Sequence, residues 1–286
     1  MYRGQLYVPH FNSQGDVNYY YTKIRNIYIQ WYRNKVVLTN SIHKYWHGWN
    51  HSDFYYHEVL MCINDLCEIT GVDWWTASLG KLEWGVNLIK QPMEVVDTML
   101  MYKFKKFESM MEQGHRYGSK CEVNGYFLKM YDKEFDSWYQ IKLSIEPTVR
   151  WEIGGNSKYL TKLFGFSPVL NQVITPDNMR NMANHSLELL RTCIRKDQRN
   201  LHKLTATEKK IIAAMENKEI REDLKAHNPE TYKNDRKRYL RILKDPEVCI
   251  RDFTDVEVEN KFNQLLSENP ACNILGNKGS ILPIAI

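Results

Sequence analysis

The chain has 286 residues, of which 43% are hydrophobic and 26% charged, a composition typical of a globular protein and not of a disordered one. No apolar run reaches the ~18–20 residues that a membrane-spanning helix needs, and the first residues lack the basic-then-apolar pattern of an export signal, so we expect no membrane contact. The six cysteines are scattered without a C-x-x-C pair, which favours free thiols in a cytoplasmic protein.

The first 155 residues or so predict a mixed α+β region. The segment from Ser52 to the stop at Gly71 has apolar residues at helical spacing. Alternating or β-rich segments predict a hairpin of Arg25–Trp31 with Val36–Thr39, and a strand over Lys81–Leu88. We also expect a helix over Pro92–Phe107 and strands over Tyr126–Lys133, Tyr139–Ile145 and Val149–Ile153.

From Ser157 onward the pattern is helical. Helices are predicted over Asp177–Arg195, after the capping box Thr205-Ala-Thr-Glu208, over Lys218–Ala226 and from Asn228-Pro229 to Lys244. We therefore predict an α+β fold with an antiparallel-rich sheet, helices packed on one face, and a mainly helical C-terminal region. The expected domains are 1–165 and 166–286.

The predicted strands each carry one charged and one apolar face, because successive side chains of a strand point to opposite sides. Glu83 and Asn87 share one face of their strand. Lys129, Tyr131 and Lys133 do so on a second strand, and Arg150 and Glu152 on a third. A plain solvated face is one interpretation, since antiparallel sheets often leave one side in water. An active site is the other.

Three motifs favour the active site, and they lie in a fixed order. They are Lys81-Leu-Glu83-Trp-Gly85-Val-Asn87, Lys129-Met-Tyr131-Asp132-Lys133 and Arg150-Trp-Glu152, with SIHKYWHGWN (41–50) upstream. Over about residues 40–165 the chain resembles the replication-initiation proteins of rolling-circle plasmids and filamentous phages. The resemblance implies a bacterial cytoplasm, and host helicase and polymerase as partners. It leaves open plasmid or phage, and a monomer or a homodimer.

The resemblance implies a reaction in which a tyrosine hydroxyl cuts one DNA strand at an origin. A covalent 5′-phosphotyrosine and a free 3′-OH result, and the strand is later rejoined. Mg²⁺ or Mn²⁺ would bind oxygen ligands beside the scissile phosphate. Glu83 and Glu152 are the expected ligands, with Asp132 a third candidate, and Lys129, Lys133 and Arg150 would offset negative charge.

The nucleophile is expected to be Tyr159 or Tyr131. Members of the resembled family place it shortly after the R-x-E strand, which favours Tyr159 in NSKYLTKLFG. That residue could equally belong to the apolar side of a helix. Tyr131, between two lysines within a strand, is the second candidate.

Histidines gather at His43, His47 and His51, a spacing that would align them on a helix and suit zinc. Gly48, Trp49 and Asn50 argue against a continuous helix there, and local packing or DNA contact is the alternative. The pair of histidines separated by one apolar residue, which binds metal in other rolling-circle initiators, does not occur in the sequence.

A basic excess lies in residues 195–244, with 15 Lys/Arg against 8 Asp/Glu, within an overall net charge of +5. Residues 205–244 are typical of a helix-turn-helix whose last helix enters a DNA groove, or of a plain solvated helix. The expected DNA-contacting residues are Lys44, Lys129, Lys233, Lys237, Arg241 and Lys244. The alternative function is a non-catalytic DNA-binding protein, such as a repressor or degenerate initiator; a structural protein is a third reading.

Overall fold

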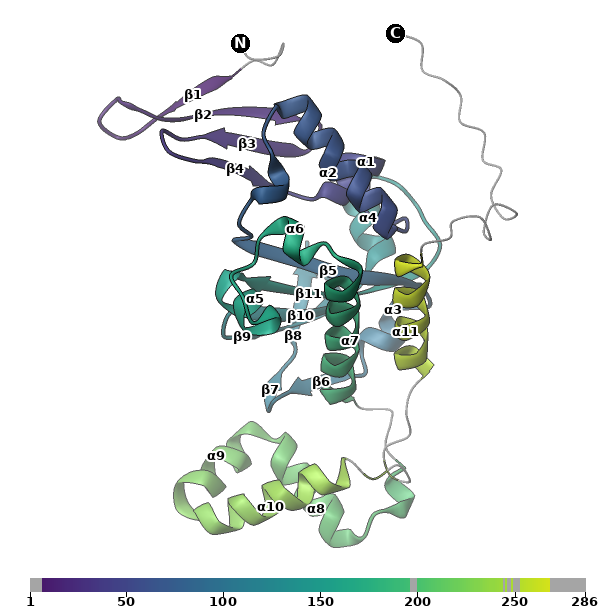
Figure 1. Ribbon diagram of the computed structural model, residues 1–286. Helices are drawn as coiled ribbons and strands as arrows, with labels where there is room; N and C mark the ends of the chain where they lie inside the picture. The colour runs from purple at the N-terminus through teal and green to yellow at the C-terminus, as the bar shows by residue number, and fades with distance from the viewer. Residues whose placement is uncertain (1–6, 196–199, 244, 246–247, 249–252, 268–286) are drawn as a thin grey trace. The chain divides into compact units, whose positions relative to one another are not determined.

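The computed structural model describes residues 7–195, 200–243, 245, 248 and 253–267. Figure 1 labels the helices and strands of the chain, which forms two compact units. Unit 1 comprises Met1–Ser78, Val169–Met179 and Phe262–Ile286, and unit 2 comprises Leu79–Pro168 and Arg180–Lys261. This division differs from the predicted boundary at residue 165. The first four strands pair only with one another in the described part of the chain, and the C-terminal helices share a buried apolar cluster with Met101 and Ile194 of the second unit.

Unit 1 is built on a four-stranded antiparallel meander. Its strands are β1 (Val8–Phe11), β2 (Val17–Ile24), β3 (Ile27–Trp31) and β4 (Val36–Thr39), paired in chain order. The predicted hairpin is thus confirmed. Helices α1 (Ile42–His47) and α2 (Tyr56–Thr70) follow, and α2 ends at Gly71, whose positive φ of 69° suits glycine. The short helix α6 (Leu170–Val173) also belongs to this unit.

Unit 2 contains a five-stranded antiparallel sheet, which confirms the α+β prediction. The strand order is β5 (Lys81–Ile89), β11 (Thr148–Asn156), β10 (Tyr126–Asp132), β9 (His115–Val123) and β8 (Glu108–Glu112). One face is apolar, with Met130, Trp151 and Val86 side by side across three strands. Trp151 is fully buried there, and its indole N–H donates to Ser186 Oγ of α7 (Pro176–Thr192) over 3.0 Å.

Two predicted elements are wrong. Only Pro92–Val96 of the expected helix Pro92–Phe107 is helical (α3), and β6 (Met99–Tyr102) and β7 (Lys105–Lys106) follow, because β6 pairs with β12 (Ile194–Arg195). The expected strand Tyr139–Ile145 overlaps helix α4 (Lys133–Ile141), since Asp132 caps that helix by accepting the amide of Phe135.

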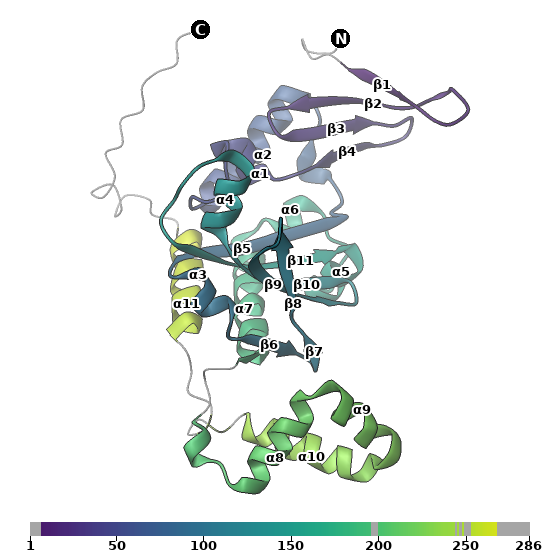
Figure 2. The same ribbon diagram turned by 180° about the vertical axis from the view of Figure 1, so that it is seen from behind.

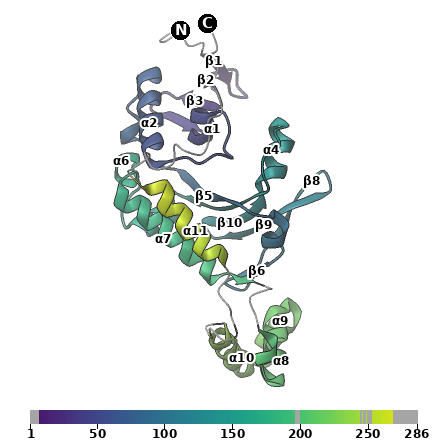
Figure 3. The same cartoon turned by 90° about the vertical axis from the view of Figure 1, so that its right-hand side faces the viewer.

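The helices of unit 2 lie on both faces of its sheet. Figure 3 shows α4 on the side opposite to α7, so helical cover is not restricted to one face. Helix α5 (Ser157–Phe164) follows β11 directly, and α11 (Phe253–Leu266) interacts with the end of β5 through an ion pair between Lys90 and Glu257.

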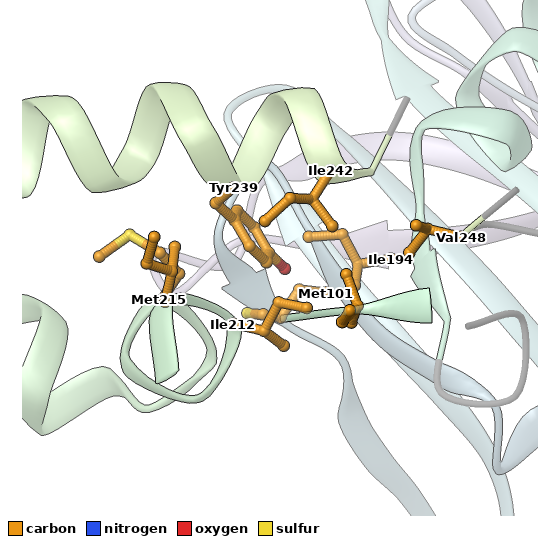
Figure 4. Close-up of a cluster of buried hydrophobic side chains, with 9 residues drawn as sticks. Met101, Ile194, Ile212, Met215, Tyr239, Ile242 and Val248 are labelled. Carbon is orange, nitrogen blue, oxygen red and sulfur yellow. The ribbon is translucent and has the colours of Figure 1, made fainter. Parts of the chain in front are cut away.

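The C-terminal region is helical, as predicted. Helices α8 (Ala206–Glu216), α9 (Lys218–His227) and α10 (Pro229–Ile242) follow one another with single-residue breaks, and the capping box at Thr205 is present. Tyr239 and Ile242 of α10 pack with Met215 of α8 and with Met101 and Ile194 (Figure 4). Among the described residues, no helix has both the length and the apolar character needed to span a bilayer.

Candidate active site

The charged face of the unit 2 sheet brings the two predicted glutamates together. Glu152 lies directly opposite Lys129 on β10 and Gly85 on β5, while Glu83 lies opposite Gly154. Both carboxylates therefore project from the same face of neighbouring strands, as the alternating pattern predicts. This register also places Lys129 within reach of both carboxylates.

Glu152 is the centre of a hydrogen-bonded network. Its Oε2 accepts Arg150 Nε over 2.8 Å, and its Oε1 accepts Lys129 Nζ over 3.1 Å. Arg150 also donates from Nη1 to the amide oxygen of Asn87 over 3.1 Å. Burial alone would raise the pKa of Glu152, but the charges of Arg150 and Lys129 outweigh it and lower that pKa to about 2.

Lys129 lies between the two carboxylates. Its Nζ is 3.1 Å from Glu152 and 4.0 Å from Glu83, which is also paired with Lys81 over 2.5 Å. Glu83 is 38% exposed and Glu152 only 8%. Two carboxylates of one face fit the oxygen donors that Mg²⁺ or Mn²⁺ prefers. A divalent ion held by both would replace the Lys129 ammonium, because the same oxygens serve both cations.

No group of three or more histidine, cysteine or acidic side chains placed to hold a metal occurs in the part of the chain that the structure describes. The predicted third ligand, Asp132, does not join the glutamates, because its side chain caps α4 and it follows Met130 on the apolar side of β10. Burial raises the pKa of Asp132.

Tyr131 lies on the charged face, with its hydroxyl donating to Glu152 Oε2 over 3.4 Å. The residue is 7% exposed, since α4 covers this end of the face. Burial, and then the negative charge of Glu152, raise the pKa of Tyr131 well above its usual value. Lys133 starts α4, is buried, pairs with Asp136 and has its Nζ 5.8 Å from the Tyr131 ring centroid.

Tyr159 lies on the opposite side of the sheet from the glutamates. Its ring stacks on Tyr126 at 4.3 Å and covers Gly155, where an added Cβ would be 2.2 Å from the ring. Gly155 and Tyr126 face each other on the apolar side. The expectation of Tyr159 beside a metal held by Glu83 and Glu152 therefore disagrees with the fold.

The Tyr159 hydroxyl instead makes a 2.6 Å hydrogen bond with Nε2 of His185 on α7. Burial, followed by the charge of Tyr126, raises the pKa of Tyr159, and burial lowers the pKa of His185. His185 was not anticipated from the sequence, because only packing of α7 against the sheet brings residues 26 positions apart into contact.

Phe127 is a further component of the charged face, and it was not anticipated from the sequence as a site residue. Its ring lies on Gly154, where an added Cβ would be 2.1 Å from it. The ammonium groups of Lys129, Lys120 and Lys81 are 4.3, 5.1 and 5.6 Å from the ring centroid. The alternation that places Lys129 and Tyr131 on one face also places Phe127 there.

The histidine cluster packs locally. Helix α1 ends at His47, so His51 does not align with His43 on one helix. His47 Nε2 is 3.2 Å from Glu58, and His43 stacks on Phe54 at 4.6 Å. Lys44 lies in α1, within unit 1.

Helix α10 presents its predicted cations to solvent. Lys233, Lys237 and Arg241 are exposed, while Tyr239 on the opposite side is fully buried. Lys244 lies outside the described residues. The helix as a whole has five Lys/Arg against two Asp/Glu.

No protein-family model matches the chain, and no curated protein matches it. The resemblance to rolling-circle initiators therefore rests on the three motifs and their order alone.

Proposed function

We propose that the chain cuts and rejoins one strand of DNA through a tyrosine on the charged face of unit 2, as a rolling-circle replication initiator does. The observation that carries this proposal is the position of the Tyr131 hydroxyl, 3.4 Å from Glu152 and on the same face as Glu83. A phenol, two carboxylates and several cations are the groups that this transfer requires.

In the proposed step the Tyr131 oxygen attacks the phosphorus of the scissile phosphodiester. The bond to the 3′ oxygen breaks, a 5′-phosphotyrosine forms, and the departing strand end takes up a proton to become a 3′-OH. Glu152 accepts the hydrogen bond of the Tyr131 hydroxyl and so orients its oxygen. The phenol proton passes to water as the bond to phosphorus forms, and water returns a proton to the departing 3′ oxygen. Mg²⁺ or Mn²⁺ bound by Glu83 and Glu152 would neutralise charge on the phosphate.

The cations of the face have separate parts in this proposal. Arg150 keeps Glu152 ionised through its 2.8 Å contact, and Asn87 fixes the guanidinium. Lys129 contacts both carboxylates; a divalent ion held by Glu83 and Glu152 would take its place, and its ammonium would then be available to a phosphate oxygen. Opening of α4 is needed for a strand to reach Tyr131, because that residue is 7% exposed.

We assign duplex recognition to α10. Its exposed Lys233, Lys237 and Arg241 follow one another at four-residue steps and so form a stripe along one side. Removal of one cation that binds a phosphate should reduce the salt slope of binding to duplex DNA by ~0.9. A Lys237→Ala variant should show this reduction, whereas Lys218→Ala on α9, also exposed, serves as the matched control.

The nucleophile is tested by covalent capture. The full-length protein is incubated with supercoiled origin DNA or a single-stranded origin oligonucleotide and Mn²⁺, and the tyrosine-linked oligonucleotide is mapped by mass spectrometry. We expect the adduct on Tyr131, and its loss in Tyr131→Phe but not in Tyr159→Phe. An adduct on Tyr159 would contradict the assignment and move the chemistry to the His185 side of the sheet.

A non-catalytic DNA-binding protein is the second candidate, and the closed network around Glu152 favours it, because both the carboxylate and Tyr131 are almost fully buried. The variant Glu83→Ala separates the two functions. An initiator loses cleavage and keeps origin binding, whereas a binding protein has no cleavage to lose.

A further inference from the structure

The meander of unit 1 has an aromatic face that the proposed cleavage site does not use. The strand register places His10, Tyr19 and Tyr21 on one side of the sheet, together with Lys23 and Tyr28. None of these five residues is buried. Antiparallel sheets usually carry small or charged polar groups on the wet side, so rings in this position call for an explanation.

The opposite face of the same meander is the packed one. Thr22, Ile27 and Ile29 are buried there, at no more than 4% exposure. Figures 1 and 2 view the meander from opposite directions, and both show α1 and α2 on one side of it. The aromatic face is therefore the side that these two helices leave uncovered.

The rings of this face form a row across the strands. His10 stacks on Tyr19 with centroids 4.5 Å apart and an interplanar angle of 6°, and Tyr32 follows at 5.0 Å from Tyr19. Along β2, Tyr21 and Lys23 follow Tyr19 on the same face at intervals of two residues, which separates neighbouring positions by ~7 Å; Tyr28 of β3 lies opposite Lys23. That spacing exceeds the ~3.4 Å of duplex DNA, so the rings suit bases that are not stacked on one another.

Positive charge accompanies the rings. Lys23 Nζ lies 5.3 Å from the Tyr28 centroid and Lys35 Nζ lies 5.1 Å from that of Tyr32. Residues 7–40 contain four Lys/Arg and a single acidic residue, Asp16. Each ammonium lies over one face of its ring, so a base can stack only on the other face, with the positive charge close to the phosphates that flank that base.

We infer that this aromatic face binds single-stranded nucleic acid, with bases stacked on the ring faces of Tyr19, Tyr32 and Tyr28 that are not covered by His10 or by the lysines, and phosphates paired with Lys23 and Lys35. The face is complementary to unpaired bases on an anionic backbone. Single-stranded DNA and RNA both have these features. Cross-strand aromatic pairs also stabilise a sheet on their own. That role alone does not account for the lysines at the ring faces or for the shortage of acidic residues. The inference does not depend on cleavage, since Tyr131 and Glu152 belong to unit 2.

The test uses the full-length protein and fluorescently labelled oligo-dT and oligo-U, with binding followed by anisotropy. Tyr19→Ala and Tyr28→Ala should each raise the Kd by about 5- to 150-fold, the range expected for loss of one base–aromatic stack. Tyr20→Ala is the matched control, because Tyr20 is a neighbouring exposed tyrosine of β2 that points to the other face. Tyr19→Phe should bind as the wild type does.

A second measurement needs no variant. Photocrosslinking of an oligonucleotide that contains 5-iododeoxyuridine should label peptides from residues 17–32 of the wild-type protein. Preference for oligo-dT or oligo-U identifies which nucleic acid is bound. The inference is overturned if neither oligonucleotide binds, if Tyr20→Ala weakens binding as much as Tyr19→Ala, or if crosslinks occur only in unit 2. Loss of cleavage in Tyr131→Phe with unchanged oligonucleotide binding separates this face from the cleavage site.

Discussion

Replacement of Glu152 by glutamine should destabilise the protein by about 3 kcal/mol at neutral pH. The carboxylate is 8% exposed and its two oxygens accept Arg150 and Lys129. The fall in its pKa from 4.5 to about 2 corresponds to about 3 kcal/mol, at 1.36 kcal/mol for each pKa unit. Glutamine keeps the size of the side chain but leaves two cations without their counter-charge.

The same substitution predicts a definite pH dependence. Because the pKa of Glu152 is lower in the folded protein than in the unfolded chain, its contribution is complete above about pH 4.5 and is lost as the pH falls towards about 2. Urea unfolding followed by circular dichroism should therefore show a wide gap between wild type and Glu152→Gln at pH 7. The gap should close in acid, where wild-type Glu152 is itself protonated.

Glu83→Gln is the matched control, since Glu83 is on the same face but 38% exposed, and its ion pairs are screened by water. It should have little effect on the urea midpoint. Glu152 does not stabilise the fold in this way if Glu152→Gln is as stable as the wild type at pH 7, or if the loss of unfolding free energy is the same at pH 3 as at pH 7.

Other substitutions test the packing around this face. Gly154→Ala places a Cβ 2.1 Å from the Phe127 ring and should lower the free energy of unfolding by about 1 kcal/mol, because the ring must move. Thermal unfolding should show no such loss when the same substitution is made in a Phe127→Ala background. Trp151→Phe removes the 3.0 Å hydrogen bond to Ser186 in a fully buried site, and its urea midpoint should report a loss of about 1–3 kcal/mol. Lys129→Met removes the ammonium between the two carboxylates and should raise Mn²⁺ affinity about tenfold or more by calorimetry; unchanged affinity would argue against a metal there.

The sequence alone determined which side chains share a face. A strand alternates its side chains strictly, so Glu83, Lys129 and Glu152 had to project from the charged side once their segments formed one sheet. Helix ends with local signals, such as the capping box at Thr205 and the glycine after α2, were predictable for the same reason, because their causes lie within a few residues.

Only the tertiary structure decided which strands are neighbours and on which face of the sheet Tyr159 lies. Pairing of β10 with β11 puts Lys129 directly opposite Glu152, and that register has no signature in either segment. The short apolar run at Met99–Tyr102 fits a helix or a strand, and its partner β12, almost a hundred residues away, makes it a strand. Tyr159 follows Glu152 closely in sequence, yet it lies on the other face because the chain passes Gly155 and turns into α5 there. Strict alternation of side chains holds only within a strand. Because β11 ends at Asn156, the sequence separation between Glu152 and Tyr159 does not determine on which side of the sheet Tyr159 lies.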